Sequence, residues 1–236
     1  MNEHFDAIAG QYDRSLPPHV VEHYLQKRLD YIREHAPAGA SVLDVGCGTG
    51  LLADRVQRAG FSVTGVDPSE GMLEFLRKRN PRVATEVASG TDLPFPDSSF
   101  DLVYCVAVMH HIADRGEVEK ALGEMVRVTA AGGRVLVWDH NPRNPYWRLL
   151  MARVPQDTGE ERLIPEREIL AGLRRAGATP LDSAQLGLVP DFTPRAMVGV
   201  AARLERGAER VPGLRRLCAH NVILAAKPPP GSPPPG

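Results

Sequence analysis

Cysteine, aromatic residues and long apolar runs are scarce in this 236-residue chain. The three cysteines (Cys47, Cys105, Cys218) have neither the even count of a disulfide framework nor the spacing of a metal site. We therefore expect reduced thiols in a cytoplasmic protein, with no metal. No apolar run approaches the ~18 residues of a membrane-spanning helix, and the N-terminus shows no signal-peptide pattern.

An excess of either charge is also missing. The formal net charge is −1, which does not favour a nucleic-acid partner, because proteins that bind nucleic acids usually carry a basic patch. Hydrophobic residues make up 43% of the chain, enough for one sizeable core. We expect a single domain over residues 1–227, with an arm and helix at 1–37 and a helical insertion or lid at 190–218. The proline-rich tail, 228–236, should be disordered.

Hydrophobic periodicity predicts alternating helices and strands. Apolar residues at three- and four-residue steps predict a helix over 17–35, after an arm at 1–16. Alternation from about 40 to 140 predicts a parallel sheet covered on both faces. Further helices are expected at 51–59 and 165–176. One strand is expected to end in the glycine loop described next. Further strands are expected over residues 62–66, 83–87, 100–106, 132–139, 181–188 and 219–227.

A glycine-rich loop follows the first predicted strand, in the run Val42 to Gly50. Glycines allow a sharp turn and let a ligand approach the backbone closely. The helix that follows offers free N–H groups to such a ligand. Dinucleotide sites need a third glycine where this chain has Leu51, and phosphate-binding P-loops need a lysine after Gly50. The spacing therefore points away from phosphate-bearing ligands.

An acidic residue, Asp67, follows the second predicted strand, 21 positions after Gly46. A strand–helix–strand unit of that length returns such a residue to the same edge of the sheet, where it can accept hydrogen bonds from ribose hydroxyls. Together with the glycine loop, this position predicts a nucleoside-containing ligand at that edge.

The run from Asp44 to Gly50 resembles the glycine loop of class I S-adenosylmethionine-dependent methyltransferases. The strands after it, together with Asp92-Leu93 and Met109 to Ile112, resemble the ubiquinone/menaquinone-biosynthesis type (methyltransferase type 11). The resemblance extends over about residues 40–140. It implies a Rossmann-like, seven-stranded, mostly parallel sheet with helices on both faces and the last strand antiparallel.

S-adenosylmethionine is the cofactor that this resemblance implies. Asp92-Leu93 should then meet the adenine, and Tyr12 should close over the donor. The implied cofactor-binding residues are Tyr12, Asp44, Gly46, Cys47, Gly48, Gly50, Asp67, Pro68, Met72, Thr91, Asp92, Leu93, Cys105 and His110. Asp44 is expected to position the loop through backbone bonds, and Cys47 to pack beneath the cofactor rather than act as a nucleophile.

Three histidines are candidate general bases for methyl transfer: His110, His111 and His140. They follow the fourth and fifth strands, at the edge where open α/β sheets bind ligands, and neutral imidazole accepts protons near pH 7. The alternative is that one packs against the cofactor and another supports the loop. Asp139 is expected to orient a neighbouring group. Trp138, Tyr146 and Trp147 would line an acceptor pocket or join the core.

The expected reaction is in-line methyl transfer to a small-molecule acceptor, at oxygen, with carbon and nitrogen open. A non-catalytic cofactor-binding protein on the same fold and, less favoured, a nicotinamide oxidoreductase are the alternatives. Either a monomer or a homodimer is compatible with the sequence.

Two other segments bear on the acceptor. The Asn-Pro-containing loop 139–148 would lie over the pocket mouth, where Arg143 and Arg148 could receive a polar or anionic acceptor; the alternative is an ordinary structured loop. Residues 191–216 hold six arginines and three acids. That segment would be a solvated cap, an acceptor lid, or, not favoured, a contact with an anionic membrane or lipid carrier.

Overall fold

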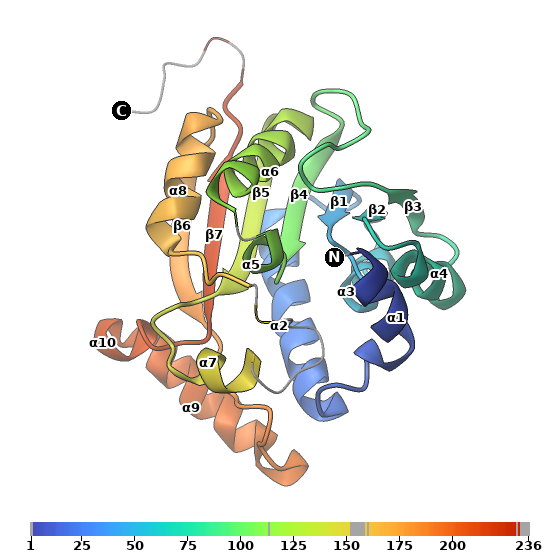
Figure 1. Ribbon diagram of the computed structural model, residues 1–236. Helices are drawn as coiled ribbons and strands as arrows, with labels where there is room; N and C mark the ends of the chain where they lie inside the picture. Colours follow the sequence, from blue (N-terminus) through green and yellow to red (C-terminus); the bar gives the residue numbers. More distant parts are fainter. Residues whose placement is uncertain (1, 113, 152–158, 160, 230, 232–236) are drawn as a thin grey trace.

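The structure is a computed structural model that describes residues 2–112, 114–151, 159, 161–229 and 231 (Figure 1). Within these residues seven strands form one sheet in the order β3-β2-β1-β4-β5-β7-β6. Strand β7 runs antiparallel to both of its neighbours, whereas β1 to β5 are parallel. The strands are β1 (Ser41–Val45), β2 (Ser62–Asp67), β3 (Ala84–Val87), β4 (Phe100–Val106), β5 (Thr129–His140), β6 (Thr179–Leu186) and β7 (His220–Ala226). The predicted mostly parallel sheet with an antiparallel last strand is confirmed.

Helices cover both faces of this sheet, and several more gather at one of its edges (Figure 1). Their bounds are α1 (Asn2–Tyr12), α2 (Pro18–His35), α3 (Leu51–Arg58), α4 (Glu70–Arg79), α5 (Met109–Ile112), α6 (Arg115–Val128), α7 (Tyr146–Met151), α8 (Glu166–Arg175), η1 (Arg195–Met197), α9 (Val198–Arg210) and α10 (Pro212–Arg215). No helix of the described residues is long and apolar enough to cross a membrane.

The core has two layers because alternate residues of each strand point to opposite faces of the sheet. One layer joins Leu43 and Val103 to α6 and α8, and the other joins Val42 and Leu102 to α2, α3 and α4. The central strands β1 and β4 are buried on both faces. This burial explains their nearly continuous apolar sequences.

The carboxyl ends of β1, β2, β4, β5 and β6 meet at one edge of the sheet. Because β7 is antiparallel, its first residue reaches that same edge, where His220 pairs with His140, the last residue of β5. The topology therefore brings together residues that are 80 positions apart in the sequence.

The N-terminal segment differs from the arm expected over residues 1–16, because most of it is the helix α1. This helix docks on the N-terminus of α4 through Asp6. Its carboxylate accepts hydrogen bonds from Ser69 Oγ (2.5 Å) and the Gly71 N–H (2.9 Å), which hold the pKa of Asp6 below its usual value. Most of the expected tail, 228–236, lies outside the described residues.

Candidate active site

The glycine loop between β1 and α3 has the tight geometry that its sequence predicts. Gly46, Gly48 and Gly50 all have positive φ, at 72°, 54° and 77°. A Cβ at Gly46 would lie 2.5 Å from Val108 Cγ2, and one at Gly50 would overlap Leu76. The loop is tied to β2, since the N–H groups of Gly46 and Cys47 both donate to the Val66 carbonyl. Side chains other than glycine would therefore displace the loop.

Asp67 ends β2 and fixes the same loop from the other side. Its carboxylate accepts hydrogen bonds from the N–H groups of Gly48 and Ser69, each at 2.9 Å. The residue is only 8% exposed. Burial raises the pKa of Asp67, and the two N–H donors offset part of that rise. Both carboxylate oxygens thus have backbone partners, where the sequence predicted ribose contacts.

The expected adenine residues lie on a turn after β3. Asp92 is exposed, and its N–H donates to the Ser89 carbonyl. Thr91 Oγ1 lies 2.8 Å from Ser89 Oγ. Leu93 is buried, and its N–H donates to Glu124. Thr91, Asp92 and Leu93 all lie outside the wall of the cavity described below.

Four other expected cofactor residues lie at different depths. Met72 and Cys105 are buried core residues, and Pro68 is half-buried. Cys47 packs against Gly65, where a Cβ would lie 2.8 Å from its Sγ. Burial also raises the pKa of the Cys47 thiol well above its ordinary value, which opposes a nucleophilic thiolate.

Asp44 departs from its expected role. We expected backbone hydrogen bonds, but its Oδ2 accepts from the Tyr104 hydroxyl at 2.8 Å. Burial raises the pKa of Asp44 to about 7, with Asp67 nearby adding to the rise. Tyr104 is itself fully buried in β4. Asp44 is therefore bound to the neighbouring strand β4 rather than to the glycine loop.

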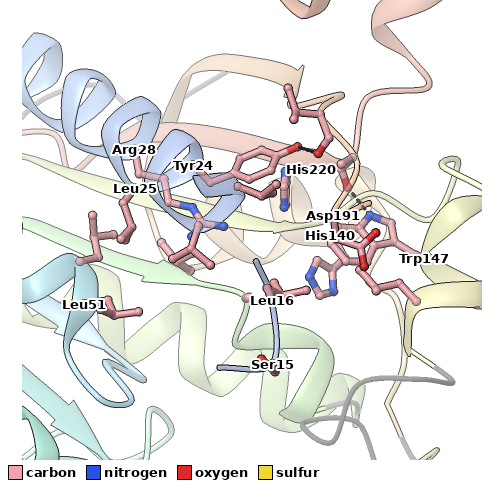
Figure 2. A pocket seen from close by; sticks show the side chains of 18 of the residues that line it. Ser15, Leu16, Tyr24, Leu25, Arg28, Leu51, His140, Trp147, Asp191 and His220 are labelled. Atoms are coloured by element: carbon pink, nitrogen blue, oxygen red, sulfur yellow. Dashed lines mark hydrogen bonds between the residues drawn. The ribbon is translucent and has the colours of Figure 1, made fainter. Parts of the chain in front are cut away.

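A cavity of about 560 Å³ opens at this edge of the sheet, and most of its wall is apolar (Figure 2). It extends from the glycine loop to the loops after β5 and β6. The predicted residues on its wall are Tyr12, Asp44, Gly46, Cys47, Gly48, His110, His111, His140, Tyr146 and Trp147. Trp138, in contrast, is a fully buried core residue.

Four aromatic rings stack along the cavity wall, in the order His111, His110, His140 and Trp147. Successive ring centroids are 4.0, 4.1 and 3.6 Å apart. Burial lowers the pKa of His111 to about 4 and lowers that of His140 well below its ordinary value. Both rings are therefore neutral at pH 7.

His110 and Asp139 form a buried dyad at the centre of this stack. The Asp139 carboxylate accepts hydrogen bonds from His110 Nδ1 (2.8 Å) and from the N–H groups of Met109 (2.7 Å) and His140 (2.6 Å). Burial opposes ionisation of Asp139, yet His110 and these donors hold its pKa below the usual value. As expected, Asp139 orients its neighbours, and it fixes the His110 ring through Nδ1.

The same three side chains meet the distance requirement of a metal site. Ligand atoms of His110, Asp139 and His140 lie within 4.8 Å of one another. However, Nδ1 of His110 already binds the Asp139 carboxylate, and the rings of His110 and His140 are tilted by 36° to each other. The carboxylate already accepts three N–H donors. The arrangement suits proton transfer better than cation binding.

Helix α1 closes the glycine-loop end of the cavity. Phe5 meets His111 edge-on, with centroids 5.3 Å apart. Asp13 accepts short hydrogen bonds from Thr49 Oγ1 and from Arg79. These contacts hold Tyr12 and its neighbours against the loop, as expected for a covering segment.

The arginine-rich segment forms η1, α9 and α10 (Figure 1), and α9 packs beside α2. Glu205 on α9 is 1% exposed and accepts hydrogen bonds from His23, Lys27, and the N–H groups of Leu188 and Val189. These bonds fix the loop after β6 on the cavity wall. Arg143 of the Asn-Pro loop is exposed, and the Arg148 side chain lies outside the described part of the structure.

Sequence patterns missed several residues of the wall. Tyr24 and Arg28 come from α2, Leu188 and Phe192 follow β6, and His220 opens β7. Arg28 carried a usable signal, since it is a charged residue beside the apolar face of a helix. Leu188, Phe192 and His220 reach the wall through the pairing of β6 and β7 with β5, which no local pattern reveals.

Comparison with known proteins agrees with this geometry. Residues 43–137 match the methyltransferase domain family of type 11. A demethylmenaquinone methyltransferase of Tropheryma whipplei is 35% identical over 161 residues, which cover 64% of this chain and 64% of that protein. One of Renibacterium salmoninarum is 32% identical, over 64% of this chain and 68% of that protein. The match to the Tropheryma protein thus falls short of two thirds of its length.

Solved structures show the same fold. An S-adenosylmethionine-dependent methyltransferase of Thermotoga maritima, described as a possible histamine N-methyltransferase, superposes with a TM-score of 0.69 at 20% identity. The alignment covers 96% of this chain and 99% of that one. The glycine loop, the strand order and these matches together show that the chain belongs to the class I S-adenosylmethionine-dependent methyltransferases, in the group that includes the demethylmenaquinone methyltransferases.

Proposed function

We propose that this protein methylates a hydroxyl group on a small acceptor with a largely apolar body, such as an aromatic or quinol ring. S-adenosylmethionine, when bound, supplies an activated methyl group. The observation that carries the proposal is the His110–Asp139 dyad, a general base held in the wall of a mostly apolar cavity.

The backbone geometry of the glycine loop, at one end of the cavity, suits the binding of S-adenosylmethionine. Three glycines with positive φ let a ligand approach the loop backbone closely, beside the N-terminus of α3. We assign donor binding to this loop, to Asp67 and Asp92 at the sheet edge, and to Tyr12 on α1. Cys47 would support the loop from below, whereas Asp44, Met72 and Cys105 would support the core around it.

His110 would take the proton of the acceptor hydroxyl. Asp139 would remain ionised, keep the Nδ1 proton in place and stabilise the resulting imidazolium. His111 and His140 are neutral on either side of His110, so they would exclude water from the base without adding a positive charge.

The acceptor class is supported by the cavity and by the relatives. Leu188, Phe192 and Leu217 both line the cavity and are exposed, so its mouth is apolar. Phe192 is 72% exposed there. The relatives named demethylmenaquinone methyltransferases support a quinol-type ring among the candidates.

The test is transfer of a labelled methyl group from S-adenosylmethionine to a panel of phenols, naphthols and quinols, followed by identification of the methylated atom. We expect methoxy products. His110→Gln should lower kcat by about 10²–10⁴-fold, with unchanged affinity for S-adenosylhomocysteine. His35→Gln on α2 is the control. Unchanged kcat in His110→Gln would remove the base, a carbon-methylated product would contradict the oxygen assignment, and binding without turnover would favour a non-catalytic protein.

A further inference from the structure

Buried side-chain polar atoms that lack a hydrogen-bond partner gather beside one part of the cavity wall. Within the described residues there are four: Arg28 Nε, Trp138 Nε1, His140 Nδ1 and His220 Nδ1. Three of these residues line the cavity, and the Arg28 guanidinium lies over Trp138, 5.8 Å from its ring centroid. Polar groups buried in native proteins are nearly always hydrogen-bonded, so such a cluster points to a ligand that supplies the missing partners.

Arg28 is a cation without a carboxylate partner in the described part of the chain. Its guanidinium lies over the rings of Tyr24 and Trp138, at 5.9 and 5.8 Å, and forms no salt bridge there. Burial lowers the pKa of Arg28 to about 10, which still leaves it charged at neutral pH. The Asp44 carboxyl on the same cavity wall attracts Arg28 without forming a salt bridge, and burial raises the pKa of Asp44 to about 7, so a ligand anion would be favoured beside the buried cation.

The two histidines complete a set of donors around Arg28. His220 is 4% exposed and His140 is 8% exposed, and their rings lie 5.9 Å apart. Burial lowers the pKa of His220 to about 3, with Arg28 adding to the fall and a backbone hydrogen bond to Leu186 opposing it, so the ring is neutral at pH 7 and has a single N–H. The Tyr24 hydroxyl is already engaged, because it donates to the Val189 carbonyl at 2.9 Å. One cation and two neutral imidazoles match a single negative charge.

We propose that Arg28, His140 and His220 form a subsite that holds a carboxylate of a bound ligand. The idea rests on the proposed methyl transfer, which offers two sources: an acceptor that carries a carboxylate, or the methionine tail of the donor. The position favours the acceptor. His140 and His220 belong to β5 and β7, whereas the glycine loop follows β1, on the far side of β4 (Figure 1).

Titration calorimetry on the full chain separates the sources. The acceptor arm uses hydroxybenzoates and hydroxynaphthoates in the presence of S-adenosylhomocysteine, each compared with its neutral amide. The donor arm compares S-adenosylhomocysteine with its decarboxylated analogue. Both comparisons are made on the wild type, Arg28→Gln, Arg28→Lys and Arg33→Gln, an exposed control on the same helix.

For an acceptor carboxylate we expect at least a tenfold preference for the acid over the amide, lost in Arg28→Gln and partly kept in Arg28→Lys. Affinity for S-adenosylhomocysteine would not change. For a donor carboxylate the tenfold loss would appear with S-adenosylhomocysteine and not with its decarboxylated analogue. Equal binding of charged and neutral ligands in both arms of the wild type, which needs no variant to fold, would overturn the subsite. Because binding is measured, a failure of methyl transfer would count only against the proposed function.

Discussion

At the scale of single residues, Asp139 determines how the histidine stack can act. Its buried carboxylate accepts hydrogen bonds from His110 Nδ1 and from two backbone N–H groups. Asparagine has the same shape but offers only one acceptor oxygen. The substitution therefore changes the proton position on His110 with little change in packing.

We predict that Asp139→Asn lowers kcat by about 10²–10⁴-fold, because His110 would be held in the wrong tautomer. Affinity for S-adenosylhomocysteine should stay within twofold. Asp97→Asn, at an exposed site, is the matched control. Steady-state kinetics with calorimetry checks both numbers, and a normal kcat in Asp139→Asn would rule out an orienting role.

At the scale of elements, α9 is held to α2 and to the loop after β6 by Glu205. Burial would raise the pKa of this carboxyl, but His23, Lys27 and the Leu188 N–H lower it to about 2. The loop that it fixes supplies Leu188 and Val189 to the cavity wall.

Glu205→Ala should lower the free energy of unfolding by about 3–5 kcal/mol, since it removes the acceptor of His23 and of two backbone N–H groups and leaves Lys27 with Glu209 alone. Glu205→Gln keeps one acceptor oxygen and should cost less. Arg206→Ala, on the exposed face of the same helix, should have almost no effect. Urea unfolding of the three variants tests this order, and equal stability of Glu205→Ala and the wild type would refute it.

Local sequence patterns predicted the elements whose apolar residues or glycines have the most regular spacing. The buried strands β1 and β4 have continuous apolar sequences, and the glycine loop has a spacing that few ligands fit. Helix α1 was missed because only Ala9 of its described side chains is buried and its main anchor, Asp6, binds a residue 63 positions away. Arg28 and His220 were missed as a pair because they meet only after β7 has been added beside β5.

At the scale of the whole molecule, buried titratable groups govern the response to pH. The folded-state pKa is about 4 for His111 and about 3 for His220, and that of His140 is also depressed, all below the unfolded value near 6.5. As pH falls below 6.5 the unfolded chain gains protons that the folded chain does not, so stability falls. Asp44, with a folded pKa of about 7, acts in the opposite direction between about pH 4 and 7.

We therefore predict a net loss of stability between pH 6.5 and 5, because three histidines outweigh the two carboxyls with raised pKa values, Asp44 and Asp67. Each group contributes up to about 1.4 kcal/mol per pH unit. Asp44→Asn should make the loss steeper, and His220→Gln should make it shallower. Thermal unfolding at pH 5, 6 and 7.5 measures these slopes. A stability that rises on acidification would contradict the depressed pKa values of the three histidines.

The outer surface of η1 and α9 carries a row of exposed apolar side chains beside arginines. Met197, Val200, Leu204 and Val211 fall on one stripe of the helix, and Leu204 is 68% exposed. Arg203, Arg206 and Arg210 are all exposed and form the adjacent stripe. This pattern suits a surface that meets anionic lipid.

From this surface we predict co-sedimentation with phosphatidylglycerol vesicles at low salt and release as salt is raised. Phosphatidylcholine vesicles should not bind. Leu204→Asp should reduce the bound fraction several-fold, whereas Leu181→Asp, exposed on β6, should not. A bound fraction that is equal for the two lipids would argue against an electrostatic contact with lipid.

The proposed function requires that S-adenosylmethionine binds at the glycine-loop edge of the sheet, and calorimetric titration with S-adenosylhomocysteine tests this most directly. The wild type should bind one equivalent and should not bind NADH. Asp67→Ala should weaken binding by about 1.5–3 kcal/mol, through lost charge-assisted hydrogen bonds to the ribose and to the loop. Equal affinity of Asp67→Ala and the wild type, or no binding by the wild type, would contradict the placement of the donor at this edge of the sheet.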